Sequence, residues 1–446
     1  MAVMNTLEAG GHKAFLVGGC VRDTLLSRPP QDYDITTCAA PNRVSDLFPV
    51  TVPTGLRFGT VTVMTPGGPV EVTTMRRDGA YKDCRRPDHV VFSDDLRGDV
   101  QRRDFTINGL AMDSRGTVID YVGGCGDLGQ GTIRAIGSAR DRFAEDGLRL
   151  MRAARLAAQL DFTIEGETAA AAKANAHLMA KVSAERKRDE LVKILLSDRP
   201  AYGMLLLLNL GLLPNVLPEL MPCVGFEQRS KYHDQDVFGH MVSVLANSPR
   251  KLNVRMAAVL HDIGKPSTFT MDESGEGHFY QHHREGADIV RRALTSLRFG
   301  NKTIDSVATL IYFHMFRYRR IKRSSVKRFI TAVGKDNLQD LYALQIADTE
   351  SRPMSDARNQ TIALFRLVEE VLKGKEPLDR SDLAVNGHDL IEAGIPPGRK
   401  MGQILDRLTK IAVRHPMFNQ RDILLGLAGK IAGEATLDGA DPVRNI

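Results

Sequence analysis

Two aspartates near the start of the chain have the residue type and spacing that metal-dependent chemistry needs. Asp32 and Asp34 stand in the segment DYDITT, which has the composition of a short β-strand. Residues two apart on a strand project from one face with Cα atoms roughly 7 Å apart, so the two carboxylates would repel each other. A hard divalent cation, Mg²⁺ or Mn²⁺, would relieve that repulsion. Most such pairs are nevertheless turn or cap residues, so spacing alone leaves both interpretations open.

A third carboxylate and two glycines add to this interpretation. In PVEVTTM, Val70 and Val72 would face one side of a strand and Glu71 the other. Three acids on neighbouring strands could form the kind of two-metal site that drives in-line phosphoryl or nucleotidyl transfer. Gly18 and Gly19 follow an apolar strand, where their backbone N–H groups could hold a triphosphate at the start of a helix.

Two kinds of element must position these side chains. From Ala14 to about Gly137, strand-like stretches such as GTVTVMT alternate with short helical ones. From Arg140 onward, aliphatic residues recur at spacings of three and four, which is typical of helices. The sequence therefore predicts an α+β fold, in which a small mixed-sheet head is followed by all-helical segments.

Length and composition limit the class of protein. A chain of 446 residues is too long for one hydrophobic core. Its net charge of +6 mildly favours an anionic partner. The five cysteines are scattered without a CxxC pair, which argues against a disulfide framework or a structural zinc site. The longest apolar run, Met204 to Leu213, is too short to span a bilayer, and the N-terminus lacks a signal-peptide pattern. We expect a cytoplasmic protein without a membrane partner.

Four segments occur in an order that is far more specific than any one of them. They are LVGGCVRDTLLSRPPQDYDITT (16–37), RRDFTINGLAMD (102–113), EDGLRLMRAARLAAQLDFTI (145–164) and ERKRDELVKILL (185–196). Over roughly residues 12 to 235 the chain resembles the class II nucleotidyltransferases, which comprise tRNA CCA-adding enzymes and bacterial poly(A) polymerases. The resemblance implies a polymerase-beta-like head with a helical neck and body, and a head that adds nucleotides to an RNA 3′ end.

The resemblance also implies roles for particular residues. The metal ligands and catalytic acids would be Asp32, Asp34 and Glu71, with Mg²⁺ or Mn²⁺ as cofactor. The nucleotide-binding residues would be Gly18, Gly19, Arg22, Arg103, Asp104, Asn108, Asp146, Arg149, Arg152 and Arg155. Within this set, Gly18, Gly19 and Arg22 would hold the triphosphate.

The segment EDGLR is suited to reading a base. Asp146 and Arg149 are three positions apart, so on a helix they would be neighbours on one face. They could form only a surface ion pair, which contributes little. Alternatively, the aspartate accepts from the exocyclic amine of C or A while the arginine donates to the adjacent ring acceptor, which rejects U and G. The resemblance favours this second interpretation, since the family motif selects CTP and ATP without a nucleic-acid template.

The segment 76–92, RRDGAYKDCRRPDHVVF, resembles the flexible loop that lets CCA-adding enzymes change from C to A. We therefore predict CCA addition to tRNA from CTP and ATP. An A-adding or CC-adding enzyme and a poly(A) polymerase remain alternatives.

A second group of candidate residues lies further along the chain. It consists of His240, His261, Asp262, His282 and Asp348. Such histidine and carboxylate ligands on several helices suit a divalent transition metal, although any one of the histidines could be an ordinary core residue. Their order resembles the HD phosphohydrolase superfamily, so a phosphohydrolase that uses the head to hold RNA is an alternative from another class. The basic segment 316–328 is either a solvated helix face or a contact for tRNA phosphates.

These observations predict a succession of five domains, and they leave the oligomeric state open. The domains are a catalytic head (1–137), a helical neck with the base-selecting motif (138–197), an RNA-binding body (198–232), an HD domain (233–350) and a tRNA-binding helical tail (351–446).

Overall fold

The computed structural model describes residues 1–79, 88–228, 235–316, 322–351, 356–374 and 376–433. The chain forms two compact units. Unit 1 consists of Met1–Gly225 with Arg292–Gly300, and unit 2 consists of Phe226–Arg291 with Asn301–Ile446. The predicted finer division at residues 137, 197, 232 and 350 stays a prediction.

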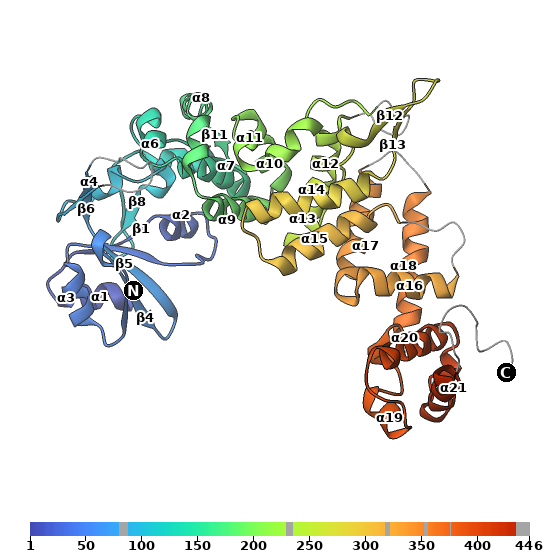
Figure 1. Ribbon diagram of the computed structural model, residues 1–446. Helices are drawn as coiled ribbons and strands as arrows, with labels where there is room; N and C mark the ends of the chain where they lie inside the picture. The colour runs from blue at the N-terminus through green and yellow to red at the C-terminus, as the bar shows by residue number, and fades with distance from the viewer. Residues whose placement is uncertain (80–87, 229–234, 317–321, 352–355, 375, 434–446) are drawn as a thin grey trace. The chain divides into compact units, whose positions relative to one another are not determined.

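A seven-stranded mixed sheet is the centre of the head in unit 1 (Figure 1). The strands are β1 (Ala14–Val17), β2 (Asp34–Thr37), β3 (Thr51–Gly55), β4 (Thr60–Thr65), β5 (Gly68–Thr74), β8 (Leu110–Met112) and β9 (Val118–Asp120). Their order across the sheet is β3-β4-β5-β2-β1-β8-β9. Strands β2 and β5 run parallel, whereas the other neighbouring strands in this sheet are antiparallel.

β-branched residues and small helices explain the stability of this sheet. In β4, Val61 and Val63 are fully buried, as expected for alternate side chains that face a core. Helices α1 (Ala2–Ala9) and α3 (Pro41–Leu47) pack against the sheet and against each other, and α2 (Gly19–Leu25) packs on β1 and β8. The last residue of β1 and the first residue of β2 therefore lie together beside the first turn of α2.

Helices make up most of the rest of unit 1. The further elements are β6 (Arg76–Asp78), β7 (Val90–Phe92), α4 (Leu96–Gln101), α5 (Gly124–Gly129), β10 (Thr132–Ile133), α6 (Ala139–Glu145), α7 (Leu148–Leu160), β11 (Thr163–Ile164), α8 (Gly166–Ala174), α9 (Ala184–Leu195), α10 (Pro200–Asn209) and α11 (Leu213–Val216). Helix α7 packs on α9 and α10 through its aliphatic face. The polar positions Arg149, Arg152 and Arg155 recur at a spacing of three, so they share the other face of α7.

Among its described residues, unit 2 is helical except for one hairpin of β12 (Phe269–Met271) and β13 (Gly277–Phe279). Its helices are α12 (Val237–Ala246), α13 (Leu252–Leu260), α14 (His282–Ser296, which ends in unit 1), α15 (Asn301–Phe313), α16 (Arg323–Val333), α17 (Leu338–Glu350), α18 (Ala357–Lys373), α19 (Gly387–Glu392), α20 (Arg399–Arg414) and α21 (Arg421–Gly433). Helix α13 is central, since it packs on α12, α15 and α17 and is almost wholly apolar. Helices α19, α20 and α21 share a separate apolar core.

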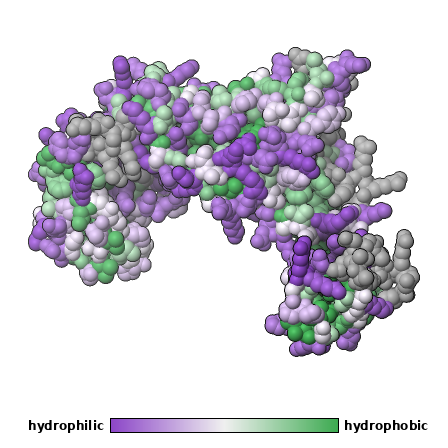
Figure 2. Space-filling view, viewed as in Figure 1, coloured by the Kyte–Doolittle hydropathy of each residue, from purple (hydrophilic) through white to green (hydrophobic). Residues whose placement is uncertain are grey.

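The predicted α+β class, with a mixed-sheet head followed by helical segments, is confirmed. The visible face in Figure 2 is mostly hydrophilic, with hydrophobic residues between the hydrophilic ones. Among the described residues, no helix has both the length and the apolar composition that crossing a membrane requires.

Candidate active site

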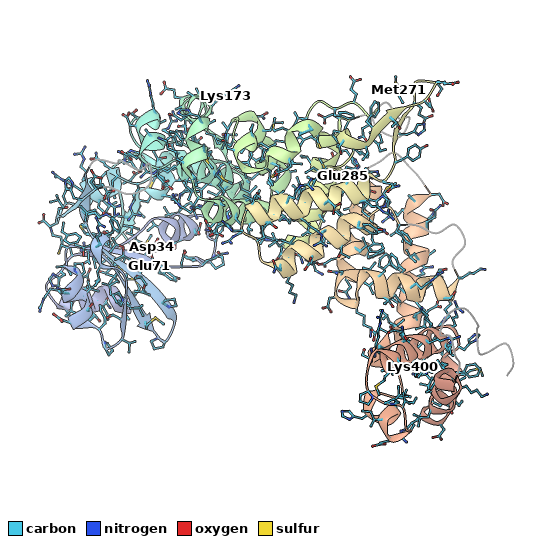
Figure 3. All side chains as sticks on the ribbon, in the orientation of Figure 1. Asp34, Glu71, Lys173, Met271, Glu285 and Lys400 are labelled. Carbon is cyan, nitrogen blue, oxygen red and sulfur yellow. The ribbon has the colours of Figure 1, made fainter. Side chains whose placement is uncertain are left out.

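The register between two parallel strands places two of the predicted acids side by side. Asp34 of β2 lies opposite Glu71 of β5, and both are labelled on the blue sheet in Figure 3. The expectation that Asp32 shares the strand with Asp34 was wrong, because β2 begins at Asp34 and Asp32 lies in the preceding bend. The physical reason is the end of the neighbouring strand: Val17, the last residue of β1, pairs with Asp34. After Val17 the chain turns into α2, so no residue of the neighbouring strand pairs with Asp32.

The three carboxylates still act on one another. Burial, the charge of Glu71 and the charge of Asp32 together raise the pKa of Asp34 to about 6, against the opposing charges of Arg103 and Arg152. Clustered carboxylates with a raised pKa are the donor set that a hard divalent cation binds, because the cation removes the repulsion. These residues therefore fit a divalent metal.

The turn between β1 and α2 requires glycine at one position. Gly18 has a φ of +80°, which favours glycine, and it precedes the first residue of α2. A Cβ atom on Gly18 would lie 3.2 Å from Nη1 of Arg103 and 3.7 Å from Oδ2 of Asp34. The missing side chain thus allows the guanidinium of Arg103 and the carboxylate of Asp34 to approach the same stretch of backbone.

A cavity of about 430 Å³ is lined by the predicted nucleotide-binding residues. Its lining consists of Gly18, Gly19, Arg22, Asp32, Asp34, Arg102, Arg103, Asp104, Asn108, Asp146, Leu148, Arg149, Arg152, Arg155, Arg186 and Lys193. Of the predicted site residues of unit 1, all of which are described, Glu71 alone is outside this lining, and it adjoins Asp34 through the strand register.

Arg102, Arg186 and Lys193 were missed as site residues. Arg186 and Lys193 stand within the segment ERKRDELVKILL, and Arg102 precedes Arg103 in RRDFTINGLAMD. Their position inside these motifs is the feature of the sequence that could have identified them as site residues. With them, eight basic side chains face four carboxylates in the cavity. The excess positive charge suits a polyphosphate.

A chain of hydrogen bonds links the start of α2 to helix α7. Nη1 of Arg22 donates to Oδ1 of Asn108 at 2.7 Å, and Nδ2 of Asn108 donates to Oδ1 of Asp104 at 3.2 Å. Nε of Arg152 donates to Oδ2 of Asp104 at 2.7 Å. Burial would raise the pKa of Asp104, but the charge of Arg152 outweighs it and holds the pKa well below its usual range. Asp104 is therefore ionised and fixes the orientation of Asn108 and Arg152.

The predicted helical pairing of Asp146 with Arg149 was wrong. Asp146 has an extended backbone, with φ −142° and ψ 106°, and lies between α6 and α7. Its carboxylate accepts from the backbone N–H of Leu148, a local bond that competes with continuing the helix. Arg186 forms an ion pair with Asp146 at 2.8 Å, while Arg149 pairs with Glu145 at 2.5 Å. Both predicted residues nevertheless line the cavity.

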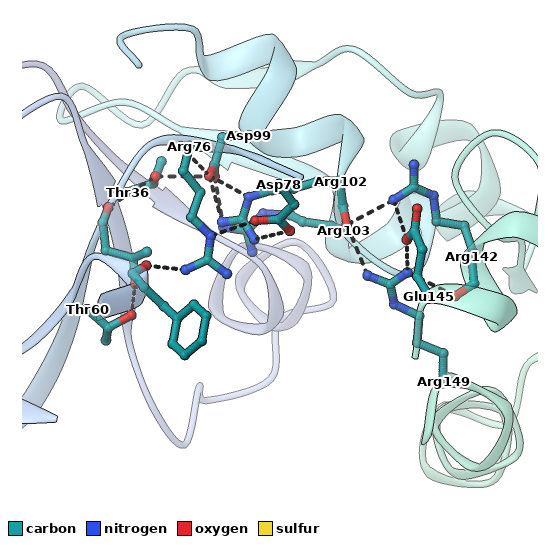
Figure 4. Close-up of polar contacts among 12 residues, drawn as sticks. Thr36, Thr60, Arg76, Asp78, Asp99, Arg102, Arg103, Arg142, Glu145 and Arg149 are labelled. Carbon is teal, nitrogen blue, oxygen red and sulfur yellow. Dashed lines mark hydrogen bonds and ion pairs between the residues drawn. The ribbon is translucent and has the colours of Figure 1, made fainter. Parts of the chain in front are cut away.

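A buried aspartate of α4 connects strand β2 with the arginines of the cavity (Figure 4). Oδ1 of Asp99 accepts from Arg102 at 2.7 Å, and Oδ2 accepts from Arg103 at 3.4 Å and from the hydroxyl of Thr36 at 3.2 Å. Burial would raise the pKa of Asp99, but the charges of Arg102 and Arg103 lower it overall. Since Thr36 belongs to β2, one carboxylate connects the strand of Asp34 to two basic residues.

The same network reaches the segment EDGLR, for which the sequence predicted base selection. The backbone carbonyl of Arg102 accepts from Arg142 at 3.2 Å and from Arg149 at 3.1 Å. Both arginines also donate to Glu145 (Figure 4). Arg149 is thus held by groups from two parts of unit 1.

The five predicted metal-ligating residues of unit 2 come together in a buried cluster. Nε2 of His240 lies 3.2 Å from Oδ1 of Asp348, and Nε2 of His261 lies 3.2 Å from Oδ2 of Asp262. Nε2 of His282 lies 3.4 Å from Oδ1 of Asp262. Such a set of imidazoles and carboxylates could hold a divalent transition metal.

Sequence reasoning missed two members of this cluster. His314 lies just after α15, with Nε2 at 3.5 Å from Oδ1 of Asp262. Lys265 lies 2.7 Å from Oδ2 of Asp262 and donates to Gln228 at 2.6 Å. A lone histidine in the apolar segment IYFHMF gave no metal signal, whereas Lys265 stands in the motif HDIGK.

Two predicted segments fall partly outside the described residues. In the predicted flexible loop, β6 and β7 pair as an antiparallel ribbon, while residues 80–87 lie outside the description. Residues 317–321 of the basic segment also lie outside it, and the segment continues into α16.

Three family models match the chain. They are described as "Poly A polymerase head domain" (residues 14–134), "Probable RNA and SrmB- binding site of polymerase A" (161–223) and "tRNA nucleotidyltransferase domain 2" (282–428). With the sheet and its acids, they define a nucleotidyltransferase, a class that uses divalent metal ions.

Named relatives give the family within this class. The CCA-adding enzyme of Lactiplantibacillus plantarum is 36% identical over 96% of this chain and 95% of its own. That of Lactobacillus gasseri is 46% identical over 94% of each chain. The solved structure of the Bacillus stearothermophilus CCA-adding enzyme in complex with CTP is 28% identical, covers 97% of this chain and 96% of its own, and has a TM-score of 0.73. The chain belongs to the family of CCA-adding enzymes.

The raised pKa of Asp34 predicts a pH-dependent effect on stability. Between its unfolded pKa of 3.8 and its folded pKa of about 6, the folded protein binds more protons at Asp34 than the unfolded chain does. Ionised Asp34 therefore lowers the stability of the metal-free protein, and fully so above pH 6. Replacing it with neutral asparagine (Asp34→Asn) should raise the free energy of unfolding at pH 8, by at most about 3 kcal/mol, and change it little below pH 4.

Urea unfolding between pH 4 and pH 8 in the presence of a chelator would measure this effect. Asp46→Asn is a matched control, because Asp46 is an exposed carboxylate paired with exposed Arg43. An Asp34→Asn variant that is no more stable than wild type at pH 8 would show that the three carboxylates do not repel one another as described.

Proposed function

We propose that the protein adds CCA to the 3′ ends of tRNA from CTP and ATP, with pyrophosphate as leaving group. The observation that carries the proposal is the pairing of Asp34 with Glu71 beside a basic cavity lined by the base-selecting motif. The relatives are named as CCA-adding enzymes, and the Bacillus stearothermophilus protein was solved with CTP. The cytoplasmic location expected from the sequence remains part of this proposal.

The acids of the head would hold Mg²⁺ or Mn²⁺. Asp32, Asp34 and Glu71 are the ligands we propose, on the basis of their proximity and the raised pKa of Asp34. When bound, the metal ions would make the tRNA 3′ hydroxyl a better nucleophile and would neutralise charge on the departing pyrophosphate. Arg103 lies beside Gly18 and Asp34, so it is placed to bind phosphate oxygens next to the acids.

The remaining cavity residues would bind and orient the nucleotide. We assign the triphosphate to Gly18, Gly19, Arg22 and Arg103, because these residues line the cavity beside Asp32 and Asp34. Asn108 and Arg152, fixed by ionised Asp104, would contact the ribose and phosphates. Arg155 is held by Glu190 at 2.6 Å and adds positive charge to the same lining.

Base selection would use two side chains that are fixed by separate partners. Asp146 would accept from the exocyclic amine of C or A, and Arg149 would donate to the adjacent ring acceptor. Arg186 orients Asp146 through two hydrogen bonds of 2.8 and 3.2 Å. Glu145 and the carbonyl of Arg102 orient Arg149. Since each side chain has its own support, the pair could present one fixed hydrogen-bonding pattern.

The five predicted domains are part of the proposal. Residues 1–137 would catalyse, 138–197 would select the base, and the body (198–232) and tail (351–446) would bind tRNA. The matched models for RNA binding and for tRNA nucleotidyltransferase domain 2 overlap these last segments.

A second candidate function belongs to residues 233–350. We propose that His240, His261, Asp262, His282 and Asp348 bind a divalent transition metal, because they converge on buried Asp262. A hydrolase acting on phosphate esters is the function such a centre favours. Lys265 adds a positive charge beside Asp262.

The head acids give the first test of nucleotide addition. Asp32→Ala and Asp34→Ala should each abolish incorporation of CTP and ATP, because they remove metal ligands, while tRNA binding should persist because other surfaces supply it. Incorporation of labelled nucleotide and a tRNA gel-shift assay measure the two properties. Substantial addition by either variant at normal Mg²⁺ would remove these residues from the mechanism.

Wild-type protein should extend tRNAs that end at the discriminator base, at C and at CC. Extension of the CC-ending tRNA alone would indicate an A-adding enzyme, and arrest after two C residues a CC-adding one. Long A tails on unrelated RNA would indicate a poly(A) polymerase.

The partners of Asp146 give a test of base selection. Asp146→Ala should let UTP and GTP compete with CTP, because the acceptor for the exocyclic amine is lost. Arg186→Met should weaken selection in the same direction, by about tenfold or more, because it removes a charged hydrogen-bond partner of Asp146. A competition assay with all four nucleotides measures both variants.

Arg188→Met is the matched control, since Arg188 lies on the same helix and pairs with Asp189 instead. Selectivity that is unchanged in both Asp146→Ala and Arg186→Met would show that Asp146 and Arg186 form only a structural ion pair and do not select the base.

The division of labour between the two sites is also testable. The double variant His261→Ala, Asp262→Ala should retain CCA addition, because the polymerising groups lie in residues 1–197, and should lose any hydrolysis of phosphate esters. Addition assays, hydrolysis of p-nitrophenyl phosphate and circular dichroism would be compared with wild type. A folded double variant that cannot add CCA would contradict this division.

A further inference from the structure

We propose that Arg142 is a positioning residue for base selection, which acts by holding together the groups that orient Arg149. Among the described residues, those that line the nucleotide cavity include Arg149 but not Arg142, so Arg142 would act on a base only through its neighbours. This inference rests on the base selection proposed above and names a further residue on which that selection depends.

Arg142 and Arg149 donate to the same two acceptors. Nη1 of Arg142 donates to Oε2 of Glu145 at 3.0 Å and to the carbonyl oxygen of Arg102 at 3.2 Å. Arg149 donates to the same carboxylate oxygen at 2.5 Å and to the same carbonyl oxygen at 3.1 Å. Because the two guanidinium groups share both acceptors, a change at Arg142 alters the surroundings of Arg149 directly.

The two shared acceptors come from separate parts of unit 1. Glu145 is the last residue of α6, whereas Arg102 follows α4. The side chain of Arg142 connects them, and its backbone carbonyl also accepts from Nη1 of Arg149 at 3.0 Å. Arg142 therefore fixes the spacing of the acceptors without help from Arg149 and supplies a third acceptor itself.

The donors that remain on Arg149 show why this spacing matters for a base. Both hydrogens of Nη1 are used, one by the carbonyl of Arg142 and one by Glu145. Nη2 donates one hydrogen to the carbonyl of Arg102. Nε–H and the other hydrogen of Nη2 are left to donate to a base. Since the guanidinium is planar and rigid, the three acceptors that hold it also set the direction of these remaining donors.

The charge of Glu145 gives a second reason. Its Oε2 is shared by two guanidinium groups, and the three side chains are only 11% to 23% exposed. Without Arg142, Arg149 alone would compensate this carboxylate, which would draw its guanidinium toward Glu145 and away from the base. We expect weaker discrimination between bases, with nucleotidyl transfer retained, because the hydrogen bonds of Arg142 do not involve the acids of the head.

A second cavity of unit 1 makes the position of Arg142 accessible. This cavity has a volume of about 800 Å³, and its lining includes Gln101, Thr106 and Arg142. Nε of Arg142 is buried and has no hydrogen-bond partner among the described residues. Removing the side chain should therefore leave a space that is open to this cavity and fits a free guanidinium ion.

Selectivity and its chemical rescue give the test. With a tRNA that ends at the discriminator base, Arg142→Ala should lower the ratio of kcat/KM for CTP to that for UTP by about tenfold or more, because charged hydrogen bonds are lost. Millimolar guanidinium chloride should restore much of this ratio, because the ion can bridge Glu145 and the carbonyl of Arg102. Loss of selectivity that guanidinium does not restore would assign Arg142 a merely structural role and overturn the proposal.

Two further variants separate this inference from the base selection on which it rests. Arg140→Ala is the matched control and should keep the wild-type ratio with or without guanidinium, because Arg140 is an exposed residue of the same helix that lines the same cavity. Reduced selectivity in Asp146→Ala, together with wild-type selectivity in Arg142→Ala, would overturn the role of Arg142 alone. Wild-type selectivity in both variants would overturn the proposed base selection as well.

Discussion

Unit 1 is organised around three carboxylates that repel one another. Asp34 is the most constrained of them, since the strand register fixes it opposite Glu71 and the preceding bend brings Asp32 near. Burial and these two charges raise its pKa to about 6. The same repulsion that weakens the metal-free fold gives the site its affinity for a divalent cation. The proximity of the acids to a cavity rich in arginine then allows metal and triphosphate to be held together.

Buried acids of a different kind hold the arginines in place. Asp99 and Asp104 each lose solvation, but each keeps its charge because basic side chains surround it. Asp99 joins Thr36 of β2 to Arg102 and Arg103, and the carbonyl of Arg102 joins them to Arg149. The strand that carries Asp34 and the proposed base-selecting residue Arg149 thus share a single network. A substitution in one part of this network would therefore alter the structure of the other part, since an unpaired buried charge is strongly unfavourable.

Unit 2 also contains a carboxylate that is crowded by ionisable side chains, but here most of the neighbours are imidazoles. Asp262 has no solvent exposure and is surrounded by imidazoles whose far nitrogens are fixed by backbone carbonyls. In the head the ligands are oxygen atoms, which prefer Mg²⁺ or Mn²⁺, whereas imidazole ligands prefer transition metals. The two proposed sites would therefore select different metals, which is in keeping with the proposal that they catalyse separate reactions.

The sequence by itself predicted nearly all the residues that the structure brings together around the cavity of unit 1, because residue type fixes charge and donor capacity and the motifs kept their order. It also determined the α+β class, through the change from alternating to helical periodicity. Tertiary structure decided which of these residues contact one another. Asp32 lies outside the strand because β1 ends at Val17, and Asp146 pairs with Arg186 because its own backbone leaves the helix. His314 joins Asp262 only through the packing of α13 against α15. Such contacts depend on where helices end and which faces meet, and local patterns in the sequence do not encode either.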